Sequence, residues 1–253
     1  MRGGAARRVV LPALVFVAII ALWEIAVPLL RIQQIVLPPP SGVAATMVST
    51  AGPIAFHARA TLWTTLVGFG AAVGLGLLLG FLIGASPTTN DALYPLLVGF
   101  NSIPKAAVVP LLVMWFGIGT IPAILTAFLL AFFPIAVNVA VGLATLEGEL
   151  RDVLRVLGAS RWQIFRKVGV PRTMPLFFAS LKVAVSSAFV GSVISETVAS
   201  NAGIGYLMAV AASDFNTRLA FGGLFVLAAM GMALYGVFAA IERRMTAWAY
   251  ADS

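Results

Sequence analysis

Side chains that could carry out chemistry are scarce in this sequence. It has no cysteine, a single histidine (His57) and nine acidic residues in a chain of 253. The lack of thiols excludes disulfide frameworks, thiolate metal sites and cysteine nucleophiles. One histidine and few carboxylates leave almost no material for a histidine-rich metal site or a Ser-His-Asp triad. We therefore expect no catalytic residue, no cofactor and no metal, and predict that the chain is not an enzyme.

A few polar side chains lie inside long apolar segments. A charge at the middle of a bilayer costs about 2.5–3.5 kcal/mol on insertion scales, so such residues usually face protein or water. Lys105 lies between Pro104 and Pro110, and prolines free backbone carbonyls in a membrane helix. We consider Lys105 a candidate for lining a solute pathway, the alternative being a buried ion pair with Glu196.

Glu196 and Asn138 are the other pathway candidates. Glu196 lies just before the sequence SNAGIG, where it would shape a gate, seat a partner protein or stabilise its own helix. A single buried asparagine such as Asn138 more often forms hydrogen bonds between helices. Glu24 and Lys182 lie close enough to the ends of their apolar segments to reach a membrane surface.

The elements that hold these residues are predicted to be membrane helices. The chain is 61% hydrophobic and 10% charged, whereas soluble domains are roughly half apolar and a quarter charged. A spanning helix needs about 20 apolar residues. We predict an all-α, six-span polytopic membrane protein that forms a single domain over 1–253. The spans are expected at 9–30, 61–84, 92–115, 121–144, 176–199 and 219–241.

Shorter elements are expected between the spans. Pro38–Pro40 cannot lie inside a helix, and Ser41 is predicted to cap a short surface helix that ends near Gly52. A further short helix is expected within 200–218. Gly76, Gly80 and Gly84 share one face of the second span, which favours close packing against another helix.

The basic residues indicate how the chain is oriented, because cytoplasmic loops are rich in lysine and arginine. With six spans, the two termini and the 145–175 loop lie on one side of the membrane. That side carries Arg2, Arg7, Arg8, Arg151, Arg155, Arg161, Arg166, Lys167, Arg172, Arg243 and Arg244. The other side carries only Arg31, Arg59 and Arg218. We therefore place both termini and this loop in the cytoplasm.

The polar loop at 145–175 is the most informative stretch. Its sequence indicates a helix, a tight turn at Gly158, a second helix and a stop at Pro171. An amphipathic loop lying on the membrane surface would also place arginine outside and tryptophan inside. Periodicity alone leaves both interpretations open.

This loop resembles the cytoplasmic signature of permease subunits of ABC importers. The signature is Glu-Ala-Ala, three residues, Gly, nine residues and Ile-x-Leu-Pro. Here Asp152-Val153-Leu154, Gly158 and Val168-x-Val170-Pro171 have the same spacing. The stretches LPPPSGV, IPKAAVVPLLVMWFGIG, GASRWQIFRKVGVP and ISETVASNAGIGYLM resemble the nitrate/sulfonate/taurine branch of these permeases.

The resemblance implies a fold, partners and an activity. The fold is that of a type I ABC importer permease. The partners are a second copy of the chain, two ABC ATPase subunits and an extracytoplasmic solute-binding protein. The activity is inward transport of a small solute, such as a sulfonate, taurine, nitrate or a vitamin precursor, across the bacterial plasma (inner) membrane. The implied ATPase-coupling residues are Asp152, Val153, Leu154, Gly158, Ala159, Ser160, Arg161 and Pro171.

The sequence lacks the G-x-x-x-x-G-K-[ST] loop that cradles nucleotide phosphates, so energy from ATP must arrive through contact with a partner. One alternative is an ATP-independent secondary transporter or channel, which predicts charged relays or inverted halves. Another is an intramembrane enzyme, which needs catalytic residues gathered at one depth. Nucleic acid is not an expected partner, because basic residues are confined to the flanks of the spans. The expected surroundings are the lipid bilayer and a small-molecule solute.

Overall fold

The computed structural model describes residues 3–144 and 153–247, and within these ranges it contains helices and no β-strand. A short helical turn at 153–156 follows the gap. The helices are α1 (Gly3–Leu29), α2 (Pro40–Ser49), α3 (Ala51–Ala85), α4 (Pro87–Ser102), α5 (Lys105–Phe116), α6 (Thr120–Ala144), α8 (Arg161–Ile164), the π-helical η1 (Phe165–Gly169), α9 (Val170–Ala199), α10 (Ile204–Ser213) and α11 (Thr217–Met245).

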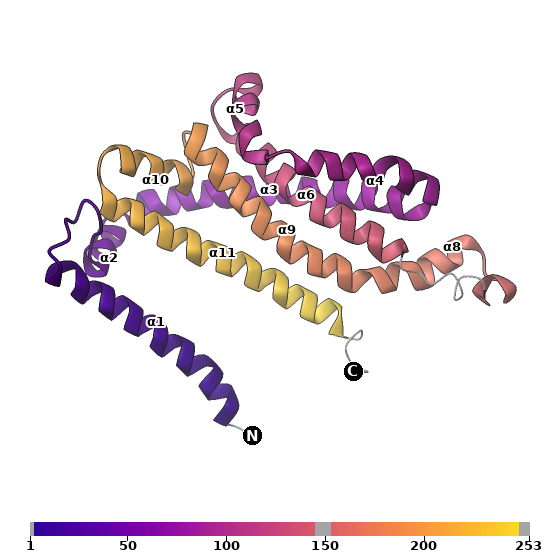
Figure 1. The fold of residues 1–253 in the computed structure, drawn as a ribbon, viewed down its shortest axis with the longest axis horizontal. Coiled ribbons are helices and arrows are strands. Elements are labelled where there is room, and N and C mark those ends of the chain that lie inside the picture. The colour runs from indigo at the N-terminus through magenta and orange to yellow at the C-terminus, as the bar shows by residue number, and fades with distance from the viewer. Residues whose placement is uncertain (1–2, 145–152, 248–253) are drawn as a thin grey trace.

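Among the described residues, five helices are long and apolar enough to cross a membrane, or six if the bent pair α4–α5 forms one span. This finding agrees with the predicted all-α, six-span class. Figure 1 shows α2 and α10 at one end of the molecule, whereas α8 and the carboxyl end of α11 lie toward the other end. The short helices therefore belong to opposite ends of the spans.

The core lies where α3, α6 and α9 pack together. Small residues of α6, such as Ala127, Ala131 and Ala136, are fully buried there beside Ile135 and Val139. Small side chains allow close approach of helices in lipid, where no water drives them together. The predicted close-packing face of the second span is observed: a Cβ added at Gly76, Gly80 or Gly84 would meet Ile135, Val139 or Leu143 of α6 at under 3 Å.

Two helix boundaries differ from the expected ones. α3 begins at Ala51, well before the expected start at position 61, so that α2 and α3 are separated only by Thr50. Pro40, and not Ser41, occupies the first position of α2, where a proline costs nothing because that N–H has no intrahelical partner. Apolar residues between Ile54 and Phe56 continue α3 through this region.

The third span is broken rather than continuous. The axes of α4 and α5 meet at 86° around Ile103 and Pro104. Pro104 has no N–H to donate, and the residue before a proline avoids the helical region, so both residues are extended. Lys105 therefore occupies the first position of α5, at a bend, and not the deep interior of one straight helix.

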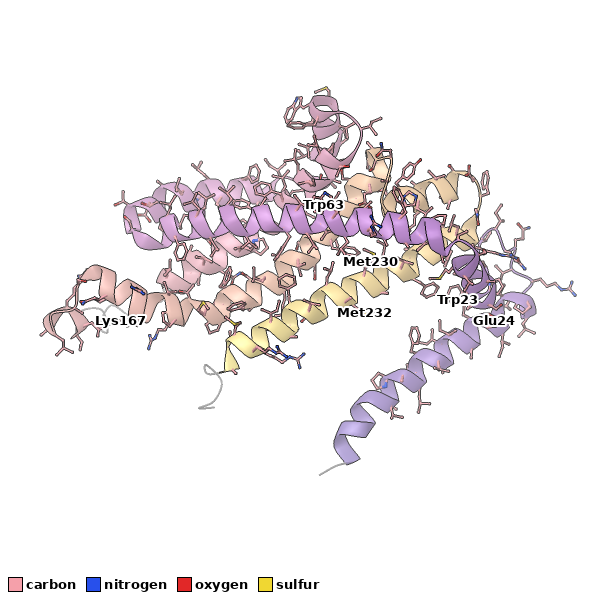
Figure 2. The ribbon with its side chains drawn as sticks, turned by 180° about the vertical axis from the view of Figure 1, so that it is seen from behind. Trp23, Glu24, Trp63, Lys167, Met230 and Met232 are labelled. Carbon is pink, nitrogen blue, oxygen red and sulfur yellow. The ribbon has the colours of Figure 1, made fainter. Side chains whose placement is uncertain are left out.

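α1 stands apart from the other helices, and only 6% of its apolar stretch is buried within the chain. Its contacts gather at its carboxyl end. The rings of Phe221 and Phe225 on α11 lie 5.7 and 6.0 Å from that of Trp23. The carboxylate of Glu24 accepts hydrogen bonds from the Ser41 N–H (2.9 Å) and hydroxyl (2.6 Å) at the start of α2. Figure 2 shows Trp23 and Glu24 side by side at this junction.

The close contact between α3 and α6 predicts the effect of adding one methyl group. In Gly80→Ala the new Cβ lies 2.6 Å from Val139 Cβ and 2.8 Å from the Ala136 carbonyl oxygen, so a backbone must shift. Overpacking of this kind costs about 1–3 kcal/mol. We expect a lower melting temperature for the detergent-solubilised protein.

Gly74→Ala is the matched control in the same helix, because its Cβ has no neighbour within 4 Å. Alanine is favoured over glycine in a helix by about 1 kcal/mol, so this variant should melt at the same temperature or higher. Equal melting of the two variants would contradict the packing described here.

Candidate functional site

The loop singled out by the sequence contains an exposed apolar turn. Asp152 lies outside the described residues, but Val153 and Leu154 begin the helical turn at 153–156. Val156 is 88% exposed, and Val153 and Leu157 are also exposed. Gly158 follows with φ of +83°, a left-handed conformation that favours glycine. The turn predicted at Gly158 is therefore present, and apolar side chains lie uncovered beside it.

Ser160 begins the next helix through a reciprocal pair of hydrogen bonds. The Gln163 N–H donates to Ser160 Oγ (3.2 Å), and the Ser160 N–H donates to Gln163 Oε1 (2.8 Å). This arrangement is a capping box, which fixes where a helix starts. Ala159 lies between Gly158 and this cap, and Arg161 is the first residue of α8.

The stop predicted at Pro171 is not observed. α8, η1 and α9 follow one another without a break from Arg161 to Ala199, and Pro171 lies in the first turn of α9. A proline removes a hydrogen bond and clashes with a preceding carbonyl in a regular helix. The π-helical turn Phe165–Gly169 directly before it changes the hydrogen-bond spacing, a usual accommodation of such strain. The loop is consequently continuous with a membrane helix.

Lys105 bonds to the end of the preceding helix and not to Glu196. Its Nζ donates to the Asn101 carbonyl oxygen and, at 2.8 Å, to Asn101 Oδ1. A cation is favourable at the carboxyl end of a helix, where carbonyl groups lack partners. The alternative of a Lys105–Glu196 ion pair is therefore wrong in this structure.

Glu196 is buried among neutral hydrogen-bond donors, with 2% of its surface exposed. Its carboxylate accepts from the Thr61 hydroxyl (2.8 Å), the Gly205 N–H (3.1 Å), and the hydroxyls of Thr64 and Ser192 (3.3 Å each). The Thr64 and Ser192 hydroxyls are also in contact with each other, and because each has a single hydrogen, one of them donates to the other in place of Glu196 when that bond forms. An isolated buried charge is costly, and these donors compensate for the lost hydration.

The same side chains capture the amino-terminal end of α10. The first N–H groups of a helix have no intrahelical partner, and leaving one buried without a partner costs about 1–3 kcal/mol. The N–H groups of Gly203, Ile204 and Gly205 donate to His57 Nδ1 (3.1 Å), Thr61 Oγ1 (2.8 Å) and Glu196 Oε2 (3.1 Å). A carboxyl oxygen is also a favourable acceptor at the positive end of the helix dipole.

Glycine is required at position 203 of this cap. Its φ is +109°, and an added Cβ would collide with the carboxyl group of Glu196. The cap therefore joins three elements: α3 provides His57 and Thr61, α9 provides Glu196, and α10 provides the backbone donors. We call the side chains of His57, Thr61 and Glu196 the α10 cap.

Asn138 and Lys182, two further polar residues of the spans, have partners other than Glu196. Asn138 Nδ2 donates to the Pro134 carbonyl oxygen one turn earlier in α6 (2.8 Å), so its amide bonds within its own helix. Lys182 Nζ of α9 lies 2.5 Å from Glu242 Oε2 of α11. A pathway role for Lys105, Asn138 and Glu196 stays a prediction.

An open pocket of about 280 Å³ lies between the end of α9 and α10. Its lining includes Glu196, Tyr206 and the hydroxyl residues Thr197, Ser200 and Ser213. Sequence reasoning missed His57 and Thr61 as members of this region. The signal was the set Thr61, Thr64 and Thr65, which recurs at helical spacing in an otherwise apolar span.

Within 3–144 and 153–247, no group of three or more His, Asp or Glu side chains is placed to hold a metal ion. The polar groups of the site are hydroxyls, one buried carboxyl group, the His57 imidazole and backbone N–H groups. Such groups orient and join helices.

Comparison with known proteins adds independent support. Residues 72–247 match the family described as "Binding-protein-dependent transport system inner membrane component". The chain is 30% identical to the formylaminopyrimidine transport permease ThiX of Halalkalibacterium halodurans, over 94% of this chain and 95% of that protein. It is 29% identical to the taurine transport system permease TauC of Escherichia coli, over 96% of this chain and 90% of that protein.

The fold also has a solved counterpart. A chain of the MetNI methionine ABC transporter, in an inward-facing conformation, superposes with a TM-score of 0.65 and 22% sequence identity. The match covers 80% of this chain and 98% of that chain. The fold is that of a type I ABC importer permease, and the chain is a non-catalytic, multi-pass membrane subunit that works with ABC ATPase and substrate-binding partners. It belongs to the family of inner-membrane components of binding-protein-dependent transport systems, as an ABC importer permease of the nitrate/sulfonate/taurine group.

Proposed function

We propose that two copies of this chain form the inward translocation pathway of an ATP-driven importer, coupled to two ATPase subunits through the 145–175 loop. The solute is small, of the kind represented by sulfonates, taurine, nitrate or a pyrimidine vitamin precursor. Formylaminopyrimidine and taurine appear in the names of its relatives. The separate solute-binding protein selects among such solutes.

One observation carries the coupling proposal: an exposed apolar turn is connected through Gly158 to a helix that runs unbroken from Arg161 into a membrane span. Val153, Val156 and Leu157 offer an uncovered surface for a partner protein. The capping box at Ser160 fixes the start of the helix that runs into α9. A force applied to the turn by ATPase closure is therefore delivered to a helix that crosses the bilayer.

For coupling to drive transport, the inward-facing and outward-facing states of the permease must differ in their affinity for the partners and the solute. Closure of the ATPases supplies that difference by favouring one position of the coupling turn. The left-handed residue Gly158 separates the turn from α8 and sets the angle between them.

In this proposal both termini and the 145–175 loop lie in the cytoplasm, because basic residues gather on that side. The chain has no cysteine, so single cysteines can be added as reporters. An impermeant thiol reagent on intact cells should label Ser213→Cys, at the exposed end of α10. Ser160→Cys should react with the same reagent only after the cells are permeabilised. Labelling of position 160 in intact cells would overturn this orientation.

Gly158 provides a test of the coupling turn. A left-handed conformation costs a side-chain-bearing residue roughly 1–2 kcal/mol, and most for β-branched residues. We expect Gly158→Val to insert into the membrane but to lose the ATPase during purification, or to let it hydrolyse ATP without solute uptake. The measurements are ATPase co-purification and uptake in reconstituted vesicles.

Gly158→Asn is the control at the same position, because asparagine tolerates the left-handed region. It should retain most coupled transport. Normal transport by Gly158→Val would reduce 145–175 to an ordinary membrane-surface loop.

We also propose that Lys105 lines the solute path at the α4–α5 bend. Lys105→Met should then slow uptake and leave complex assembly intact. Asn101→Ala is the control, since it removes the Oδ1 partner of Lys105 but keeps the charge. If Asn101→Ala lowers uptake as much as Lys105→Met does, Lys105 serves to hold the bend and not the solute.

A further inference from the structure

The α10 cap bonds one short helix to two different membrane spans. His57 and Thr61 lie on α3, and Glu196 lies on α9. Three consecutive N–H groups at the start of α10, those of the cap residue Gly203 and of Ile204 and Gly205, are divided between these two spans. A sliding movement of α3 against α9 would break at least one of these bonds, so together they favour movement of α3, α9 and α10 as one unit.

Apolar contacts bind α10 to the same region. Ile204 and Leu207 of α10 are buried with Ile54 of α3, and Met208 and Leu219 pack against this cluster. Ile204 is fully buried, and Gly205 is close to Glu196 Cβ and the Val193 carbonyl oxygen of α9. The amino-terminal half of α10 is therefore packed against α3 and α9, whereas the end at Ser213 is exposed.

The cap lies at the far end of the helix that begins beside the coupling turn. From Arg161 to Ala199 the helix is unbroken. At 1.5 Å per residue its length is on the order of 55–60 Å, about twice the hydrocarbon thickness of a bilayer. Glu196 lies in the last turn of this helix. This continuous helix, which we call the rod, connects the coupling turn at one end of the spans with the α10 cap at the other.

We propose that His57, Thr61 and Glu196 are positioning residues that make α10 move together with α3 and α9 during transport. Movement of the coupling turn reaches α10 through Glu196 and the rod, and it changes the surface that α10 presents around the polar pocket. The proposal rests on the function proposed above and assigns a role to side chains that contact neither ATP nor the ATPase.

Thr61 and Thr65 offer a matched pair of variants. Both are fully buried and lie one turn apart on α3. The Thr61 hydroxyl donates to Glu196 and accepts from the Ile204 N–H, whereas the Thr65 hydroxyl has no partner in the described part of the chain. Thr→Val replaces a hydroxyl by a methyl group of similar size at either position. Thr61→Ser restores the hydroxyl and serves as the rescue variant.

The experiment uses the complete complex with its ATPase and solute-binding protein, reconstituted in lipid vesicles. Spin labels at Ser213→Cys on α10 and Val183→Cys on α9 report their separation without nucleotide and after trapping with ATP, Mg²⁺ and vanadate. Labelled chains are diluted with unlabelled chains, so that each distance arises within one copy. ATP hydrolysis is measured with and without the binding protein.

With native Thr61, we expect the same α9–α10 distance in both states. In Thr61→Val the distance should broaden or shift on trapping, and stimulation of hydrolysis by the binding protein should fall roughly fivefold or more, with the basal rate retained. Thr65→Val should match the native chain, and Thr61→Ser should recover most of the stimulation.

A distance that changes in the native chain, or equal behaviour of Thr61→Val and Thr65→Val, would overturn the proposal. Co-purification of the ATPase distinguishes a loss of coupling from unfolding. A folded Thr61→Val variant still binds the ATPase, whereas an unfolded one does not. If the native chain neither binds an ATPase nor supports stimulated hydrolysis, the proposed function fails, and this inference fails with it. If the native chain is ATP-driven while the Thr61 and Thr65 variants agree, only the inference fails.

Discussion

The hydrogen bonds that the carboxyl group of Glu196 accepts are the interaction on which the α10 end of the structure depends. A bilayer offers no water for unpaired backbone groups, so an interrupted helix must find its partners inside the protein. The interruption between α9 and α10 leaves the first N–H groups of α10 without partners in their own helix, and Glu196, Thr61 and His57 accept from them. Removing any one acceptor leaves a donor without a partner, which explains why an ionisable residue is retained in the interior of the helix bundle.

Close packing of α3, α6 and α9 brings the members of the cap within reach of one another. The glycines of α3 allow its backbone to approach α6, and Gly191 of α9 lies against the Thr126 carbonyl of α6 in the same way. A larger residue at these contacts would collide with the neighbouring helix and shift the helices relative to one another. The hydrogen bonds of the α10 cap therefore depend on small residues elsewhere in the core.

Continuity of the helix from α8 to α9 links this cap with the loop that carries the family signature. The π-helical turn at Phe165–Gly169 keeps the chain helical in front of Pro171. An interrupted chain at this point would bend instead of transmitting a displacement. The ion pair between Lys182 and Glu242 additionally holds α9 to α11 along the rod.

The sequence by itself determined the all-α membrane class, the presence of short helices between the spans and the turn at Gly158, because bilayer thickness and backbone sterics act on local composition and single residues. The spacing of residues from Asp152 to Pro171 was likewise sufficient to indicate the family. Only the tertiary structure decided the partners of Glu196, the break at Pro104 and the passage of the helix through Pro171. Hydrogen bonds between Thr61, His57 and α10 join residues more than a hundred positions apart, and their geometry depends on how α3 and α9 pack. Periodicity within one segment contains no information about that distance.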